Sequence, residues 1–325
     1  MDALIGYTGF VGSTLRRQHD FEGLFNSGNI GDAEGRSFGT VVCAAAPGSM
    51  FEANRDPERD LARTEAIIRS LEQIGSERFV LISSVACLKD FRADNEESTA
   101  FEDQLPYGKH RRLLEARVAE RSGQVLVVRL PALFGPGLKK NFLFDILNPM
   151  PTMLTEADFA SLKGALAGDL ASDLAATLDR IYTRKAAGGL FVIDRAALDD
   201  SGTRAHLEAS VIDAGLAAMR FTHPDSEFQF YDMSRLWADI QRGLESGIAV
   251  LHLAPQPVRA GVIYQALVGQ PMPVSAAKVH REDMRTGQSW LWRREGPYIA
   301  TEAEIVRDLR AFTQRERAQA PADAA

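Results

Sequence analysis

Cysteine, strongly basic segments and long apolar runs are all scarce in this chain. Only two cysteines, Cys43 and Cys87, occur among 325 residues, and both lie in apolar strand-like context, which excludes a disulfide scaffold and a cysteine-based metal site. The formal net charge is -7, so electrostatics disfavours non-specific nucleic-acid binding. No apolar run reaches the roughly 18 residues that span a bilayer, and no basic leader precedes the first strand. We expect a cytoplasmic protein that binds neither nucleic acid nor membrane.

Metal-ligand spacing is also missing. The six histidines are scattered and share no pattern typical of a metal centre, so no metal site is predicted. Hydrophobic residues make up 45% of the chain, which is enough for a large core and one or two domains.

The N-terminal half alternates short apolar runs with amphipathic stretches. Such alternation is typical of parallel strands joined by crossover helices. Little chain separates the second strand from the third, so we expect that crossover to be shortened to a loop with a stub strand near Ile30. Strands are predicted at 3–5, 24–26, 40–46, 79–83 and 125–130, and helices at 14–19, 58–74 and 107–121.

Beyond Pro136 the alternation of apolar runs and amphipathic stretches becomes less regular. Helices are predicted at 155–187, 203–218, 259–268 and 301–315, with another starting at Ser234, and strands at 189–193, 228–231 and 250–253. The low-complexity tail, 318–325, is predicted to be disordered.

A glycine-rich turn directly follows the first strand and opens a helix. Two residues separate Gly6 from Gly9, and two separate Gly9 from Gly12. In such a turn the first glycine permits a tight bend, the second admits a pyrophosphate, and the third allows close helix–strand packing. The helix N-terminus adds free N–H groups and partial positive charge. The turn is therefore predicted to hold the pyrophosphate of a nicotinamide dinucleotide, through Gly6, Thr8, Gly9, Phe10, Val11 and Gly12.

The fold class that follows is α/β, a Rossmann-type doubly wound parallel sheet. The position that reads the ribose, at the end of the second strand, holds Asn26 and Ser27. It lacks the acidic residue that would bind the ribose hydroxyls and repel a 2′-phosphate. No arginine follows at once, although Arg16, Arg17 and Arg36 could reach such a phosphate. The predicted cofactor is therefore NAD or NADP, with the choice left open.

The glycine spacing resembles that of extended short-chain dehydrogenases/reductases, the NAD-dependent epimerase/dehydratase family. Two more motifs carry the resemblance: the strand ending in Ser83-Ser84, and the helix opening at Pro106-Tyr107-Gly-Lys-His-Arg111. The resemblance covers residues 1–140 well and 226–310 loosely. It implies a catalytic set of Ser84, Tyr107 and Arg111, with Arg111 standing where the family has lysine.

The chemistry explains why the tyrosine and the cation are paired. A free tyrosine has a pKa of about 10, which is too high for a base at neutral pH, and a neighbouring cation favours the phenolate. Tyr107 and Arg111 are four residues apart, on one helix face. Arg111 keeps the charge, but a planar guanidinium is not interchangeable with an ammonium. Weakened or absent redox chemistry is therefore an alternative.

The resemblance also implies further contacts to the cofactor and substrate. The small residues Ala44, Ala45 and Ala46 would pass beneath the cofactor, and Pro131 would lie near the nicotinamide. Nucleotide-sugar members usually carry asparagine where this chain has Ala132. The nearby Lys140 and Asn141 are predicted to bind a diphosphate instead, unless the lysines are simply solvated. The predicted cofactor contacts include Asn26, Ser27, Ala44, Ala45, Ala46, Tyr107, Arg111 and Pro131, and the substrate contacts are Ser84, Leu133, Lys140 and Asn141.

The resemblance implies a two-lobed organisation and an enzymatic function. The expected regions are a dinucleotide-binding core at 1–140, an inserted and mainly helical substrate or lid region at 141–225, and returning segments with a smaller C-terminal substrate lobe at 226–317. The predicted protein is an NAD(P)-dependent oxidoreductase of the epimerase/dehydratase type, acting on a nucleotide-activated sugar or a similar polar substrate. A homodimer is left open. The alternatives are a dinucleotide-binding sensor or assembly protein without redox catalysis, and a reductase of a small non-sugar carbonyl compound.

Overall fold

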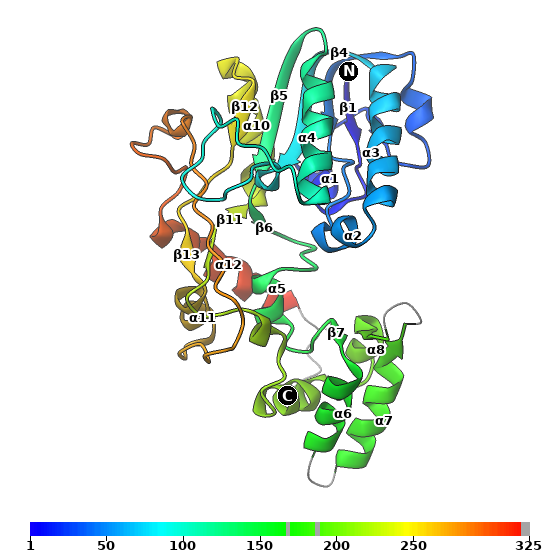
Figure 1. Cartoon of the computed structure of the whole chain (residues 1–325), viewed down its shortest axis with the longest axis vertical. Helices are drawn as coiled ribbons and strands as arrows, with labels where there is room; N and C mark the ends of the chain where they lie inside the picture. Colours follow the sequence, from blue (N-terminus) through cyan, green and yellow to red (C-terminus); the bar gives the residue numbers. More distant parts are fainter. Residues whose placement is uncertain (167–169, 186–188, 320–325) are drawn as a thin grey trace. The chain divides into compact units, whose positions relative to one another are not determined.

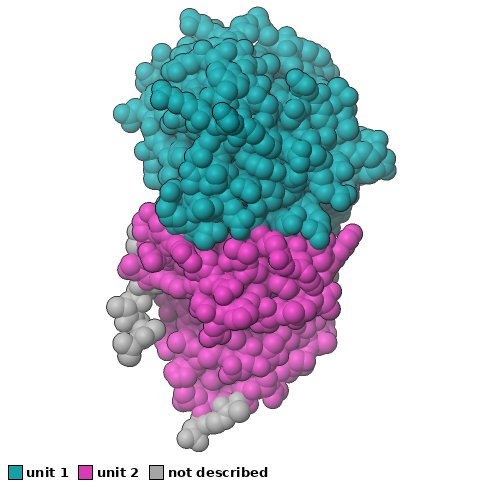
Figure 2. All heavy atoms as spheres, turned by 90° about the vertical axis from the view of Figure 1, so that its left-hand side faces the viewer, with its two compact units in different colours: residues 1–138, 227–258, 281–308 teal, residues 139–226, 259–280, 309–325 magenta. Residues whose placement is uncertain are grey.

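The computed structural model describes residues 1–166, 170–185 and 189–319. Contacts divide the chain into two compact units, coloured separately in Figure 2. Unit 1 comprises 1–138, 227–258 and 281–308, and unit 2 comprises 139–226, 259–280 and 309–325.

Unit 1 is built on a six-stranded parallel sheet (Figure 1). Its order is β12-β5-β4-β3-β1-β2, so the chain moves from β1 to one neighbour, β2, and then crosses to the other, β3. This reversal of direction is the switch point at which such sheets bind ligands, beyond the carboxyl ends of the strands. The strands are β1 (Asp2–Ile5), β2 (Gly23–Phe25), β3 (Ser37–Cys43), β4 (Gly75–Ser84), β5 (Gln124–Leu130) and β12 (Val250–His252).

Helices cover both faces of this sheet because its strands are apolar on both sides. Ala3 and Ile5 of β1 pack with Leu71 and Leu114, and so face α3 and α4, which lie side by side in Figure 1. The intervening Leu4 is fully buried on the opposite face. The helices of unit 1 are α1 (Phe10–Gln18), α2 (Met50–Arg55), α3 (Pro57–Glu72), α4 (Pro106–Ala119) and α10 (Leu236–Ser246). The predicted Rossmann-type doubly wound sheet is confirmed.

The second crossover is short, as predicted, but it holds no stub strand at Ile30. A 3-10 helix, η1 (Ile30–Ala33), occupies it. Asn26 starts this segment as a turn, since its side-chain oxygen accepts from the Gly28 N–H at 2.8 Å. β3 also ends at Cys43 rather than at Ala46.

Unit 2 contains a small antiparallel sheet of order β7-β9-β8. The predicted helix over 155–187 is wrong at residues 182–184, which form β8 and pair with β9. Tyr182 and Thr183 favour strands; residues 167–169 and 186–188 of that prediction lie outside the described part.

The helix predicted at 203–218 ends at Asp213, because Gly215 takes a positive φ of 67°. The elements are α5 (Phe142–Leu147), β7 (Met153–Leu154), α6 (Glu156–Ala165), α7 (Ala171–Ile181), β8 (Tyr182–Arg184), β9 (Phe191–Ile193), α8 (Arg195–Asp199), α9 (Arg204–Asp213) and α11 (Ala260–Val268).

The remaining elements are short, apart from the last helix. That helix, α12 (Glu302–Gln319), corrects the predicted disordered tail: Ala318 and Gln319 are helical, and 320–325 lie outside the described residues. Within the described residues, no helix combines the length and apolarity needed to cross a membrane. The short elements are η2 (Val85–Cys87), β6 (Ala132–Phe134), η3 (Ala218–Phe221), β10 (Glu227–Phe228), β11 (Phe230–Asp232), η4 (Met233–Arg235), β13 (Val258–Arg259) and η5 (Ser289–Trp292).

A carboxyl group on α5 makes the stability of unit 2 depend on pH. Burial raises the pKa of Asp145 to about 7, although the charge of Arg195 opposes the shift. Because the folded pKa lies above the unfolded value of 3.8, this group's contribution to stability is complete below about pH 4 and is lost as pH rises through 7. We expect Asp145→Asn to raise the free energy of unfolding at pH 8 by up to about 4 kcal/mol and to change it little at pH 4.

Thermal unfolding of the Asp145→Asn variant at pH 4, 6 and 8 checks this expectation. Asp213→Asn is the matched control, because Asp213 is an exposed acid of α9 in the same unit. An equal shift for both variants at pH 8 would contradict the assignment to Asp145.

Candidate functional site

The three glycines of the turn between β1 and α1 meet different requirements. Gly6 has a φ of +89°, and a Cβ there would lie 2.6 Å from the Ala44 carbonyl carbon. A Cβ on Gly12 would lie 2.0 Å from the Gly6 oxygen, so both glycines are demanded by the chain's own packing. A Cβ on Gly9 would meet only the Gly6 oxygen, at 3.5 Å. Gly9 is exposed, so its open surface suits the close approach of a ligand.

The first turn of α1 is free to receive an anion. Gly9 is the N-cap residue, and no side chain caps the helix. The first turn holds no acidic residue, and the first backbone hydrogen bond runs from the Ser13 N–H to the Gly9 oxygen. The preceding N–H groups, including those of Phe10 and Val11, therefore point out of the helix end, beside the exposed Thr8. These residues fit a dinucleotide pyrophosphate.

We expect Gly9→Asp to weaken NADH binding by at least about 100-fold, because a carboxylate would meet the pyrophosphate at the helix end. The same substitution places a preferred N-cap residue on α1, so the melting temperature should hold or rise. Fluorescence titration with NADH and a thermal melt on one preparation separate the two effects.

Gly12→Ala is the matched control for the glycine turn. Its Cβ would overlap the Gly6 oxygen, so this variant should lose stability as well as affinity. If Gly9→Asp bound NADH as the unaltered chain does, the dinucleotide site would not lie here.

Two other segments adjoin the glycine turn at the carboxyl edge of the sheet. The Ala44 N–H donates to the Ile5 oxygen at 2.8 Å, and the backbone of Ala44 and Ala45 contacts Gly6. Ala46 follows and is half-buried. The Asn26 side chain is engaged in its own turn, while Ser27 is exposed. Residues 26–29 include no carboxylate, which keeps the NAD or NADP choice open.

Tyr107 and Arg111 lie together at the start of α4. Ser84 is two residues before Ala86, which packs against Tyr107. The Arg111 guanidinium carbon lies 4.8 Å from the centroid of the Tyr107 ring. Tyr107 packs against Ala86, and a Cβ on Gly108 would lie 2.2 Å from the Ala86 oxygen. Ser84 caps η2 by accepting from the Ala86 N–H at 3.2 Å. The segment after β4 and the start of α4 are therefore in direct contact.

The two serines at the end of β4 have different partners. Ser83 is buried, and its hydroxyl donates to a Glu115 oxygen at 2.6 Å. Ser84 is half-buried. This difference supports Ser84, rather than Ser83, as the serine available to a substrate.

Arg111 is 2% exposed and is held from several directions. Its Nη2 donates to the Pro47 oxygen at 2.6 Å and lies 3.4 Å from a carboxylate oxygen of Asp60. Nη1 lies 3.4 Å from the Thr64 hydroxyl. The buried Nε has no partner among the described residues.

Sequence reasoning missed Asp60 and its pairing with two residues of α4. The second Asp60 oxygen lies 2.7 Å from Nδ1 of His110, so one carboxylate serves both His110 and Arg111. The signal was an acid on the same face of helix 58–74 as Thr64, four residues later, where both side chains are buried.

A second buried network, also missed, runs from α4 to β12. Glu115 accepts two hydrogen bonds from Arg129, at 2.9 and 2.7 Å. The Arg129 Nη1 lies 3.1 Å from His252 Nε2, which must therefore accept, and His252 Nδ1–H donates to the Arg285 oxygen at 2.9 Å. Burial lowers the pKa of His252 and keeps this ring neutral. An arginine inside the apolar strand 125–130 was the available signal, since buried charges need partners.

The predicted substrate residues are divided between the units. Leu133 belongs to unit 1, where β6 pairs with β11, and Pro131, a predicted cofactor contact, belongs to the same unit. Lys140 and Asn141 belong to unit 2. The Asn141 side-chain oxygen accepts from the Phe144 N–H at 3.1 Å and caps α5. Their roles in substrate binding stay predictions.

Both cysteines are buried and free, as their apolar context predicted. Burial raises the pKa of the Cys43 thiol to about 11 and raises that of Cys87 further. Thiols held in this protonated form are poor nucleophiles.

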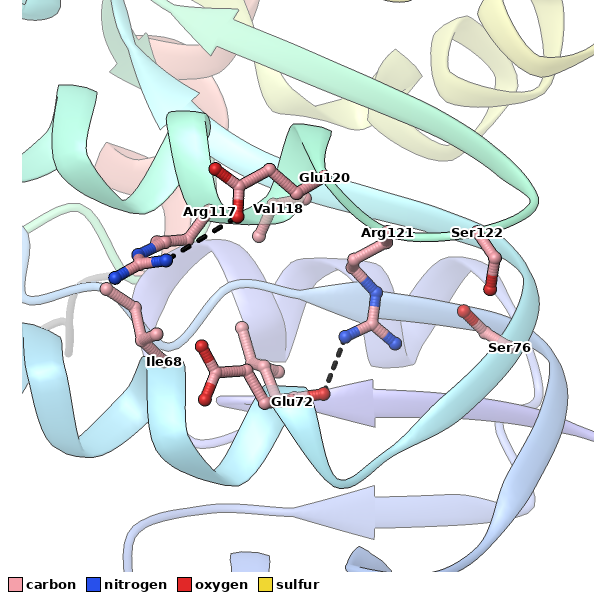
Figure 3. A pocket seen from close by; sticks show the side chains of 9 residues that line it. Ile68, Glu72, Ser76, Arg117, Val118, Glu120, Arg121 and Ser122 are labelled. Carbon is pink, nitrogen blue, oxygen red and sulfur yellow. Dashed lines mark hydrogen bonds and ion pairs between the residues drawn. The ribbon is translucent and has the colours of Figure 1, made fainter.

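A cavity of about 340 Å³ lies at the opposite edge of the sheet of unit 1 (Figure 3). Ser76, at the start of β4, lines it, together with the ends of α3 and α4. Arg117 pairs there with Glu120 at 3.5 Å, and Arg121 donates to the Leu71 oxygen at 2.5 Å. The amino edge is not where parallel sheets bind nucleotides, so this cavity is separate from the candidate site.

Several solved structures share this fold over almost the whole chain. A UDP-N-acetylglucosamine 4-epimerase from Methanobrevibacter ruminantium, solved with UDP-N-acetylmuramic acid, is 12% identical, with a TM-score of 0.60 over 98% of each chain. A short-chain dehydrogenase/reductase superfamily protein from Agrobacterium tumefaciens with bound NAD is 15% identical, with a TM-score of 0.56 over 98% of each chain. RMD from Pseudomonas aeruginosa, complexed with NADPH, is 17% identical, with a TM-score of 0.55 over 97% of this chain and 100% of that one.

These likenesses show that the chain has the fold of the extended short-chain dehydrogenases/reductases. No protein-family model matches the sequence, and no curated protein matches it either.

Proposed function

We propose that this chain is an NAD(P)-dependent oxidoreductase of the epimerase/dehydratase type that acts on a nucleotide-activated sugar. Two observations carry the proposal: Gly9 is left open at the uncapped N-terminus of α1, and Tyr107 and Arg111 lie together at the start of α4. The first feature suits a dinucleotide, and the second suits proton transfer to or from a hydroxyl group.

Each side chain has a distinct part in this proposal. Tyr107 removes the proton from a substrate hydroxyl, and Ser84 donates a hydrogen bond to the same oxygen. Arg111 places a fixed positive charge over the Tyr107 ring. A nicotinamide, when bound, supplies the hydride acceptor. Gly6, Gly9, Gly12 and the first turn of α1 would hold its pyrophosphate.

The substrate and cofactor classes rest on what similar folds contain. The relatives above were solved with a UDP-sugar, NAD or NADPH. In this chain, the turn after β2 lacks the carboxylate that would exclude a 2′-phosphate. The proposal therefore covers both NAD and NADP. A cytoplasmic location is part of it and is supported by the two unpaired thiols.

A second function, dinucleotide binding without redox turnover, is favoured by one specific observation. Arg111 is tied to the Pro47 oxygen, Asp60 and Thr64. A cation held in this way by the protein has less freedom to bind a ribose hydroxyl than the lysine usual at this position. With this second function, the chain is a sensor or an assembly protein.

Spectroscopy with nucleotide sugars tests the two functions. The purified chain is mixed with NAD or NADP and a panel of UDP-, GDP- and dTDP-sugars, while absorbance of the reduced nicotinamide is followed. Products are separated by chromatography and identified by NMR, since epimers have equal masses. Any turnover supports the enzyme. Tight NADH binding with no conversion of any sugar would overturn it in favour of the second function.

A further inference from the structure

Unit 2 has a cavity of its own, with a volume of about 600 Å³. This volume falls within the range of small-molecule sites in proteins. All its lining residues belong to unit 2. Three of them, Lys139, Lys185 and Arg195, are cationic, and the acid Asp194 is the only counter-charge among the lining residues. The net lining charge of about two positive units matches the two negative charges that a phosphoryl group carries near pH 7.

Asp194, the acid in this lining, already accepts a hydrogen bond from the protein's own backbone. The Asp194 side chain caps α8 by accepting from the Ala197 N–H at 3.1 Å. Lys139 and Lys185 are exposed, and no described carboxylate forms an ion pair with either of them. The two lysines therefore have no compensating charge of their own in the described part of the cavity.

Hydrogen bonds hold Arg195 in position, but one of its buried nitrogen atoms has no partner among the described residues. Its Nη2 donates to the Met150 oxygen and to the Thr152 hydroxyl, each at 3.1 Å, and its guanidinium lies 4.7 Å from the centroid of the Phe144 ring. The buried Nη1 has no partner among the described residues. Arg195 lines the cavity, and buried donors normally have partners, so the unmet N–H gives this guanidinium a capacity to bind an anionic ligand.

We propose that unit 2 binds a phosphoryl group in this cavity, between Lys139, Lys185 and Arg195, with Thr152 and Thr183 at its wall. Guanidinium groups bind phosphate through paired N–H donors, and lysines add point charges. All residues of this site belong to unit 2, whereas the glycine turn belongs to unit 1, and the proposal does not depend on redox activity. The phosphoryl group can come from the diphosphate of the substrate or from a separate phosphorylated metabolite.

Calorimetry with inorganic pyrophosphate tests the proposal on the full chain. The Gly9→Asp variant is used as the background, so that binding at the glycine turn is removed. We expect pyrophosphate to bind this variant, and Lys139→Gln with Lys185→Gln together to weaken binding by about tenfold or more. Lys278→Gln removes the same charge from an exposed lysine of unit 2 outside the lining and should change the affinity less than about twofold.

Further arms identify the ligand and its contacts. Arg195→Lys keeps the positive charge but removes the paired N–H donors of the guanidinium, so it should weaken pyrophosphate binding. A thermal melt of this variant should show that the fold is intact. Competition between UDP and pyrophosphate would assign the site to the substrate's diphosphate, and simultaneous binding would assign it to a separate metabolite. No pyrophosphate binding, equal affinity in the double lysine variant, or equally tight binding of acetate would overturn the proposal.

Discussion

Replacing Glu115 with alanine should lower the free energy of unfolding by about 3–5 kcal/mol, the cost of leaving one member of a buried ion pair alone. Glu115 and Arg129 are 1% and 2% exposed, and their pairing is bidentate. The alanine variant leaves the Arg129 charge in the interior without a carboxylate. It also removes the acceptor of the Ser83 hydroxyl. In a chain of 325 residues we expect the melting temperature to fall by about 4–7 °C.

Glu120→Ala on the same helix is the matched control. The Glu120 side chain is 68% exposed and pairs with an exposed Arg117, so its loss should cost less than about 1 kcal/mol. Glu115→Leu combined with Arg129→Met should recover most of the lost stability, since neither charge then remains buried. Chemical denaturation of all four proteins measures these differences. Equal losses for Glu115→Ala and Glu120→Ala would show that the buried pair is not the cause.

The same carboxylate predicts how unit 1 responds to acid. Burial alone would raise the pKa of Glu115, but the hydrogen bonds and charge of Arg129, with the Ser83 hydroxyl, more than offset this and lower it. A lowered folded pKa means that the stabilisation is present above the unfolded pKa, about 4.5, and is lost as pH falls through the folded value. The cost of Glu115→Ala should therefore shrink as the solution becomes acidic.

Local patterns were sufficient to predict the sheet and the glycine turn. Apolar runs ending in turn residues located β1, β3, β4 and β5, and the short chain between 26 and 40 predicted the reduced second crossover. Each of these features is encoded within a few neighbouring residues. The error at 182–184 has the same origin, because a short strand is defined by its partner β9 and not by its own periodicity.

The electrostatic surroundings of the candidate site could not be predicted in this way. Asp60 reaches Arg111 from a helix about fifty residues away, and Arg129 meets His252 across 123 residues. Such pairs exist only after the sheet has brought the carboxyl ends of its strands together. The family resemblance indicated that Arg111 stands where the family has lysine, but only the fold shows that Asp60 and Pro47 hold it.

Replacing Tyr107 with phenylalanine should reduce kcat by about 10²–10⁴-fold, the usual contribution of a positioned acid or base. The substitution removes only the hydroxyl. The Tyr107 backbone N–H still donates to the Asn54 side chain, and the ring still packs against Ala53 and Ala86. Arg111 retains an aromatic face beneath its guanidinium. We therefore expect the melting temperature and the NADH affinity to stay nearly unchanged while turnover falls.

Tyr264→Phe is the matched control for this loss. Tyr264 is 7% exposed, close to the 9% of Tyr107, but it belongs to α11 in unit 2. Steady-state kinetics on a converted nucleotide sugar should show that Tyr264→Phe keeps kcat within about threefold, while Tyr107→Phe lowers kcat more than it changes KM. A Tyr107→Phe variant that turned over like the unaltered chain would remove this tyrosine from the chemistry. The Tyr107–Arg111 contact would then be a packing interaction at the start of α4.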